Sequence, residues 1–260
     1  MPSSSSGLSV QPRLRILAAV REGWRAFARA PWPFIGFSLL VSVLQAVCSQ
    51  LQALGQVGEG DLLTLPRALA AVFGTIAGLM VSLWGTIGMV RGSWRATEGH
   101  RPQLATFTRW DPQALWRLFK SLWLFTLLLV LILLLAGVLA FLAGRISEAL
   151  PFLPLLVGAA LILYLSVSQK FLAQVALLEG PGMVASIRRG RQVVDPRWGQ
   201  VLLLMLLEVL FLLAGLLACF VGVFVAAPVV SCISMAAYRQ IFGAVDRTGL
   251  LAAERHHDGE

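Results

Sequence analysis

Residues 186–210 read SIRRGRQVVDPRWGQVLLLMLLEVL, and the rest of the fold can be predicted from this stretch outward. A basic amphipathic segment is followed by a helix-start signal, Asp195-Pro196, and then by an apolar run that carries one acid, Glu208. Asp195 can accept a hydrogen bond from a free N–H group of a first helical turn, and proline suits the first helical position. We therefore predict a helix that begins at this point and enters a membrane.

The same order of features recurs twice upstream. Asp111-Pro112 precedes Trp116 and the apolar run from Ser121, and a looser version stands at Ala30-Pro31. Pro31, Pro112 and Pro196 are 81 and 84 residues apart, which predicts three similar units produced by internal duplication. The alternative is that any protein made of membrane hairpins alternates basic loops with apolar spans.

The composition indicates a membrane protein. The chain is 58% hydrophobic and 13% charged with a mean hydropathy of +0.80, whereas charged residues make up about 25% of soluble globular domains. The 21 basic residues outnumber the 13 acidic ones. Because the basic residues lie in short loops beside apolar spans, they favour contact with a membrane surface and argue against nucleic-acid binding.

The fold class predicted is all-α: a polytopic bundle of six transmembrane helices arranged as three hairpins, each preceded by a basic amphipathic interfacial segment. Residues 1–12 are expected to be disordered, 13–242 to form a single membrane domain, and 243–260 to form a polar tail. The last apolar stretch would reach about 65 Å as one helix, which is twice the hydrocarbon thickness, so it must turn back. The predicted spans are 32–54, 67–90, 121–143, 155–178, 199–217 and 221–242.

The distribution of basic residues predicts the orientation. Of the 21 Lys and Arg residues, 18 fall on one side of the predicted spans, and only Arg67 and Arg145 fall on the other. The positive-inside rule then puts both termini in the cytoplasm and favours an even number of spans. We expect a multi-pass protein of the cell (inner) membrane, with a thylakoid or organelle membrane as the open alternative.

The basic segments, 13–30, 91–120 and 179–194, are candidate sites for anionic lipid head groups at the cytoplasmic face. In the first, Leu17, Val20, Trp24 and Phe27 form an apolar stripe at helical spacing. A helix that packs on the protein's own loops would require the same amphipathic pattern, so an interfacial helix and a helix packed on the protein both remain possible interpretations. The candidate lipid contacts are Arg21, Arg25, Arg117, Lys120, Arg188, Arg189 and Arg191.

Four polar residues inside the predicted fourth and fifth spans form a candidate intramembrane site: Lys170, Glu208, Gln169 and Gln174. Lys170 and Glu208 fall at equal depth, about 13 Å, on sequential antiparallel helices, and an unpaired charge there costs about 3 kcal/mol on insertion scales. We predict that they pair. The alternative is that Lys170 reaches the cytoplasmic surface while Glu208 is protonated and bonded to a backbone carbonyl or to Gln174.

No catalytic, cofactor-binding or metal-binding pattern is found in the sequence, and no enzyme is predicted. Three short motifs carry a resemblance instead: residues 179–182 (EGPG) before the basic 186–189 (SIRR), then Pro228, then 237–240 (AYRQ). With the six-span layout, they resemble the uncharacterised bacterial six-helix integral membrane proteins that include the YciC-like group and the membrane domain attached to some glycerophosphodiester phosphodiesterases. That resemblance implies a membrane module without a catalytic residue to carry over.

Two functions remain. The first, which the sequence favours, is a non-enzymatic scaffold or assembly partner in the bilayer, with a membrane protein or a second copy of the chain as its partner. The second is a permease or lipid-handling protein that uses a polar site between the fourth and fifth spans. A polar cavity lined by the four intramembrane residues would favour the second function, and a solid bundle with an exposed apolar groove would favour the first.

Overall fold

The computed structural model describes residues 14–55, 65–147, 149–218 and 222–251, and within them the chain is helical without a β-strand. Five helical runs of the described residues are long and apolar enough to cross a membrane, and a bent pair of helices makes a sixth if the pair counts as one span. This confirms the all-α class, and the long apolar helices are compatible with several membrane crossings. The runs are α2 (Pro31–Leu54), α3 (Leu65–Thr97), α5 (Pro112–Gly144), Met183–Leu217, α10 (Val223–Phe242), and the bent pair α6 (Phe152–Ser168) with Leu172–Glu179.

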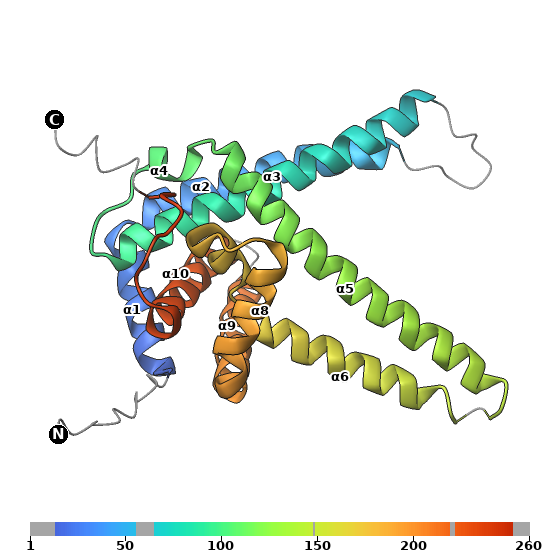
Figure 1. Cartoon of the computed structure of the whole chain (residues 1–260). Helices are drawn as coiled ribbons and strands as arrows, with labels where there is room; N and C mark the ends of the chain where they lie inside the picture. The colour runs from blue at the N-terminus through green and yellow to red at the C-terminus, as the bar shows by residue number, and fades with distance from the viewer. Residues whose placement is uncertain (1–13, 56–64, 148, 219–221, 252–260) are drawn as a thin grey trace, which may run out of the picture.

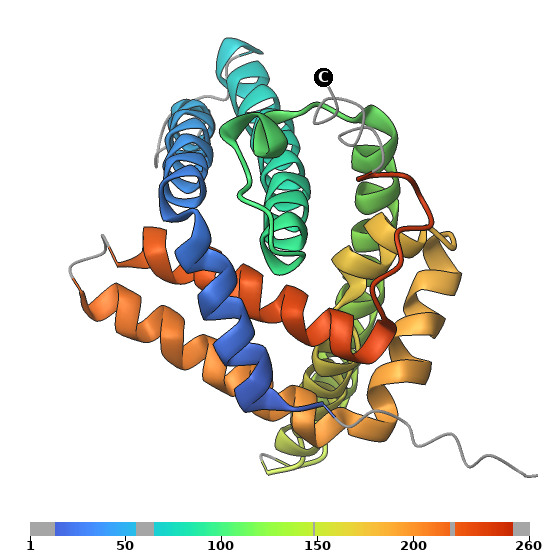
Figure 2. The same cartoon turned by 90° about the vertical axis from the view of Figure 1, so that its left-hand side faces the viewer.

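The helices form antiparallel pairs that diverge from a common base. In Figure 1 the pair α2 and α3 and the pair α5 and α6 extend toward the same side of the molecule and spread apart. The third pair is α9 (Trp198–Leu217) with α10, and Figure 2 shows it running across the direction of α2 and α3. The base, where α10 meets helix α1 (Ile16–Arg29), holds much of the buried apolar core.

Close backbone contact holds α2 against α3. A Cβ atom added at Gly74 would lie 2.8 Å from the backbone nitrogen of Gln52 and 2.9 Å from the carbonyl oxygen of Cys48, so no larger residue fits there. Gly78, one turn further along α3, is also buried against α2. The Gly74-x-x-x-Gly78 motif therefore serves helix packing, as small residues at this spacing do in membranes.

Helix α1 packs on the protein through its small residues and Phe27, and it exposes two large residues of its apolar stripe. Ala19, Gly23 and Ala26 face the protein, and a Cβ added at Gly23 would lie 2.6 Å from the backbone of Ile233 in α10. Of the predicted apolar stripe only Phe27 is fully buried, while Leu17 is 76% exposed and Trp24 is 52% exposed. Figure 2 shows α1 lying across α10. Packing on the protein and contact with a membrane interface are therefore compatible for this helix, because opposite faces of the helix would make the two contacts.

Of the two predicted helix-start signals built on Asp-Pro, the structure confirms one. Asp111 Oδ1 accepts a hydrogen bond from Ala114 N at 2.9 Å and so caps α5. Its Oδ2 accepts one at 3.0 Å from Arg91, a fully buried side chain of α3 that also donates to Arg109 O at 2.7 Å. The end of α3 is thereby fixed to the start of α5.

The predicted cap at Asp195 is wrong. Helix α8 (Met183–Val194) runs through a short 3₁₀ turn, Asp195–Arg197, into α9, and Asp195 has helical dihedral angles of −53° and −42°. A residue in that conformation is inside the helical path and cannot cap its start. Its carboxylate instead accepts hydrogen bonds from Tyr164 and Ser168 of α6, each at 2.8 Å. Asp195 therefore ties α8 and α9 to α6.

The predicted fourth span is not one straight helix. It bends by 46° between α6 and Leu172–Glu179, the latter made of α7 (Leu172–Gln174) and a π-helical turn, Val175–Glu179. Further differences are that α5 is continuous from Pro112, and that only the short α4 (Leu104–Thr108) stands before it in place of a separate amphipathic helix. Beyond α10, Thr248 Oγ1 donates to Leu177 O at 2.6 Å, so the beginning of the tail packs on the π-helical turn. The remainder of the tail, 252–260, and residues 1–12 lie outside the described residues.

Candidate functional site

The structure brings Lys170 and Glu208 into contact, which confirms the predicted pair. Lys170 lies in the break between α6 and α7, and its Nζ donates to Glu208 Oε2 from α9. Glu208 is 3% exposed and Lys170 is 19% exposed. The alternative, in which Lys170 reaches the surface and Glu208 bonds to Gln174 or a carbonyl, is not the arrangement found.

A third residue completes this group. Ser234 Oγ, from α10, donates to Glu208 Oε1 at 2.6 Å, so each carboxylate oxygen of Glu208 has a donor. The three side chains come from the α6–α7 break, α9 and α10, and the group joins these segments at one buried point. Removing one member of a buried ion pair typically costs about 3–5 kcal/mol, because the other charge is left without compensation. With both oxygens occupied, the carboxylate serves as a structural anchor in this conformation.

The two glutamines predicted to share this site point elsewhere. Gln169 is buried, and its Nε2 donates to Ile187 O of α8 at 2.9 Å. Its Oε1 has no hydrogen-bond partner and lies where α8 passes at Gly190. Gln174 lines a separate cavity. The four predicted site residues therefore divide into a bonded pair and two glutamines in different surroundings.

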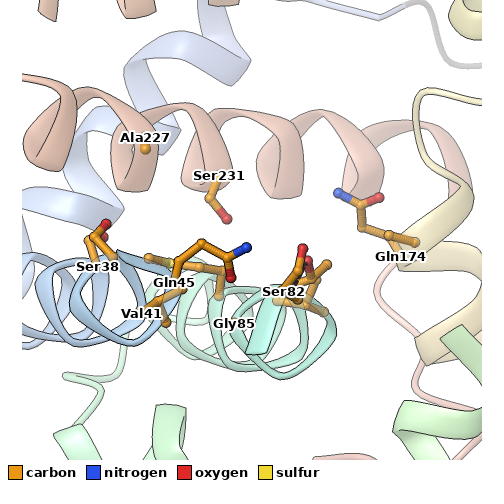
Figure 3. A pocket seen from close by; sticks show the side chains of 13 residues that line it. Ser38, Val41, Gln45, Ser82, Gly85, Gln174, Ala227 and Ser231 are labelled. Carbon is orange, nitrogen blue, oxygen red and sulfur yellow. Dashed lines mark hydrogen bonds between the residues drawn. The ribbon is translucent and has the colours of Figure 1, made fainter. Parts of the chain in front are cut away.

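The cavity that Gln174 lines has a volume of about 540 Å³ and lies among α2, α3, α7 and α10. Figure 3 shows Ser231 of α10 above Gln45 of α2, with Ser38 toward one end of the cavity and Gln174 toward the other. Gln45 is exposed, so the cavity opens at the molecular surface. Its other polar lining residues are Ser42 of α2 and Ser82 and Thr86 of α3.

Two buried polar atoms at this cavity have no hydrogen-bond partner. They are Ser38 Oγ, in a residue that is 7% exposed, and Gln174 Oε1. Buried polar groups are nearly always hydrogen-bonded, and an unsatisfied one costs about 1–3 kcal/mol. Inside a membrane no bulk water is available to meet that need. The cavity thus offers a hydroxyl and an amide oxygen to a polar group that enters it.

The predicted lipid-contacting residues also divide. Arg21, Arg25, Arg188 and Arg191 are exposed. Arg189 donates to Glu179 at 3.0 Å, and Arg191 lies 3.7 Å from Asp195. Arg117 and Lys120 are half-buried and line a second, smaller cavity between α5 and the start of α8.

The sequence did not predict Ser38, Ser231 or the other hydroxyl residues of the cavity among α2, α3, α7 and α10. Serine and threonine are common in membrane helices and often bond to the preceding turn of their own helix. Thr86 does so, since its hydroxyl donates to Ser82 O at 2.9 Å. The available signal was Gln45, which the sequence marks as a polar residue in the outer half of the first span.

Comparisons with protein families, with curated proteins and with solved structures find no match. The resemblance to YciC-like proteins accordingly stays a prediction. Among the residues that the structure describes, no group of three or more His, Cys, Asp and Glu side chains could hold a metal ion.

Proposed function

We propose that the protein is a multi-pass membrane protein that receives the polar part of a small molecule or lipid in the cavity among α2, α3, α7 and α10. This is the permease or lipid-handling function, but the site lies in this cavity and not, as the sequence predicted, between the fourth and fifth spans. The observation that carries it is the pair of buried, unpartnered polar atoms, Ser38 Oγ and Gln174 Oε1, on one cavity of about 540 Å³. Ligand sites in proteins typically measure about 300–1,000 Å³.

The position of the cavity along α2 supports this proposal. Ser38 lies 7 residues and Gln45 lies 14 residues after Pro31, where the helix begins. At about 1.5 Å per residue, these positions are about 10 and 21 Å along a helix that crosses a hydrocarbon core of about 30 Å. The polar groups therefore belong to the middle of the span. A ligand held there by hydroxyl and amide groups would need hydrogen-bonding atoms and no charge.

The surrounding helices have different roles in this proposal. The Lys170–Glu208–Ser234 group holds α10 in place and so fixes the wall that carries Ser231. Pro228 lies inside α10 and next to Ala227, which lines the cavity. A proline frees a backbone carbonyl and bends a helix, which gives α10 a point at which the wall can move.

The membrane arrangement belongs to the same proposal. Six spans with both termini in the cytoplasm would place the exposed Arg21 and Arg25 of α1 at the inner head groups. The exposed Leu17 and Trp24 of the same helix would then enter the interface, while its small residues stay on α10. No nucleic acid, metal or cofactor is needed for this role.

The second candidate function is the scaffold that the sequence favoured. One observation supports it: the hairpin of α5 and α6 projects from the base in Figure 1, and Leu131, Leu134 and Phe152 on it are about 60–75% exposed. A membrane protein or a second copy of the chain could pack there, although lipid covers such a surface equally well.

The experiment is to purify the full chain in lipid nanodiscs and to identify what it retains by mass spectrometry. Ser231→Phe fills the cavity, and Ser49→Phe is the matched control because Ser49 is an exposed residue of α2 whose hydroxyl bonds only to Ala46 O of its own helix. A small molecule or lipid should be retained by the wild type and by Ser49→Phe and lost from Ser231→Phe. An identical retained set in all three proteins would contradict the proposal, and a stoichiometric protein partner would favour the scaffold.

A further inference from the structure

A second cavity lies where the start of α8 meets the first half of α5, apart from the site proposed above. Its volume is about 180 Å³, too small for a drug-sized ligand. From α5 it is lined by Arg117, Lys120 and Ser121, and from the start of α8 by Gly182, Met183 and Ser186. Two basic side chains and a helix N-terminus therefore face one small space.

The α8 side of the cavity is electropositive and uncapped. The first N–H groups of a helix have no partner within the helix, and the helix dipole adds positive potential at that end. Helix α8 has 12 residues, no acidic residue in its first turn and no side-chain hydrogen bond at its cap, Gly182. Gly182 has a φ of +92°, and a Cβ atom added there would meet nothing within 4 Å. The free N–H groups are thus open to a ligand, as at many phosphate sites.

The α5 side contains a donor atom that is buried without a partner, together with two further polar side chains. Ser121 is 3% exposed and lines the cavity. Arg117 Nε is buried and has no acceptor. Lys120 is half-buried, with its ammonium group 5.5 Å from the ring centre of Trp116. Burying donors and charges in this way is unfavourable unless an acceptor, here an anion, meets them.

The nearest acid does not oppose an anion. Glu179, which immediately precedes Gly180 on the cavity wall, is paired with Arg189 at 3.0 Å, so its charge is neutralised. Arg117 and Lys120 line the cavity, and no carboxylate is among its lining residues.

We propose that this cavity binds the phosphate group of an oxyanion, either free inorganic phosphate or the head-group phosphate of an anionic lipid. The guanidinium and ammonium groups hold the charge, the Ser121 hydroxyl donates one hydrogen bond, and the free N–H groups of the first turn of α8 donate others. Because the cavity joins α5 to α8, an anion bound there links two hairpins of the molecule. The exposed arginines, by comparison, contribute only screened attraction to a surface.

The test uses the full-length protein and two probes. Inorganic phosphate is titrated calorimetrically into protein in neutral detergent, with chloride at matched ionic strength as the reference. Retention of phosphatidylglycerol is measured by native mass spectrometry after release from phosphatidylcholine nanodiscs that contain it. Binding of phosphate identifies the free anion as a ligand, and selective retention of phosphatidylglycerol without phosphate binding identifies the lipid.

Matched variants decide whether the cavity is the site. Arg117→Gln with Lys120→Gln removes two charges from the cavity, and Arg101→Gln with Arg145→Gln removes two exposed charges that belong neither to the cavity nor to the candidate lipid contacts. We expect at least a tenfold loss of the bound probe for the first pair, a severalfold loss for Ser121→Ala, and a change below twofold for the exposed pair. The inference is overturned if both pairs lose binding equally or if the wild type binds neither probe. Should the cavity pair fail to fold, Ser121→Ala alone decides: binding unchanged from the wild type overturns the inference.

Discussion

The buried pair Lys170–Glu208 gives the sharpest energetic prediction. Lys170→Met removes the ammonium group and leaves Glu208, which is 3% exposed, with only the Ser234 hydroxyl as a donor. Breaking a buried ion pair from one side costs about 3–5 kcal/mol, whereas replacing both members by uncharged residues is often nearly neutral. We therefore expect a loss of about 3–5 kcal/mol for Lys170→Met and a loss of about 1 kcal/mol or less for Lys170→Met with Glu208→Gln.

The assay is reversible unfolding of the purified protein in mixed micelles, in which a denaturing detergent is titrated and the helical signal gives the free energy of unfolding. Arg25→Met, at an exposed position of α1, is the control and should change that free energy by no more than about 0.5 kcal/mol. The double variant should be more stable than Lys170→Met alone. If the loss of stability in the double variant equals the sum of the losses in Lys170→Met and Glu208→Gln measured separately, the two residues do not act as a pair and the reasoning is refuted.

Three further predictions concern packing, capping and orientation. Gly23→Leu should push α1 away from α10 and lower the free energy of unfolding by at least about 1–3 kcal/mol through overpacking. Gly199→Leu should be tolerated, because a side chain at Gly199 would meet open space. Equal melting temperatures for the two variants would contradict this prediction. Asp111→Ala should lower the free energy of unfolding by about 2–4 kcal/mol, because it removes both the cap of α5 and the carboxylate bonded to the buried Arg91. Asp111→Asn should recover part of this loss. An unchanged free energy of unfolding in Asp111→Ala would count against the proposed link between α3 and α5. A cysteine at Ser147, with the native cysteines replaced by serine, should react with a membrane-impermeant reagent in intact cells; reaction only after lysis would overturn the six-span orientation.

The sequence predicted the long apolar helices well, since their signals are local. The first span was predicted as 32–54 and α2 is Pro31–Leu54, because a proline at the start and an uninterrupted apolar run leave little choice. Asp111 was found as a cap for the same reason. Asp195 carries the same two-residue signal, but α8 arrives at it already helical and α6 supplies two hydroxyl donors, so tertiary contacts decide its role.

The sites were predicted less completely. Lys170 and Glu208 could be paired from sequence because depth in a membrane can be counted along two adjacent spans. The cavity among α2, α3, α7 and α10 could not be predicted, since Ser38, Gln174 and Ser231 come from distant segments and line one space only after the 46° bend and the crossing of α10. Nor does a serine in a membrane helix reveal from sequence whether its hydroxyl bonds to its own backbone or lacks a partner.

The most direct test of the proposed function is an electron cryo-microscopy map of the full chain in a lipid nanodisc. We expect non-protein density in the cavity among α2, α3, α7 and α10, within hydrogen-bonding distance of Ser38 Oγ and Gln174 Oε1. A map in which these two atoms bond to protein groups of a closed cavity, or in which a helix of a second protein occupies it, would contradict the account.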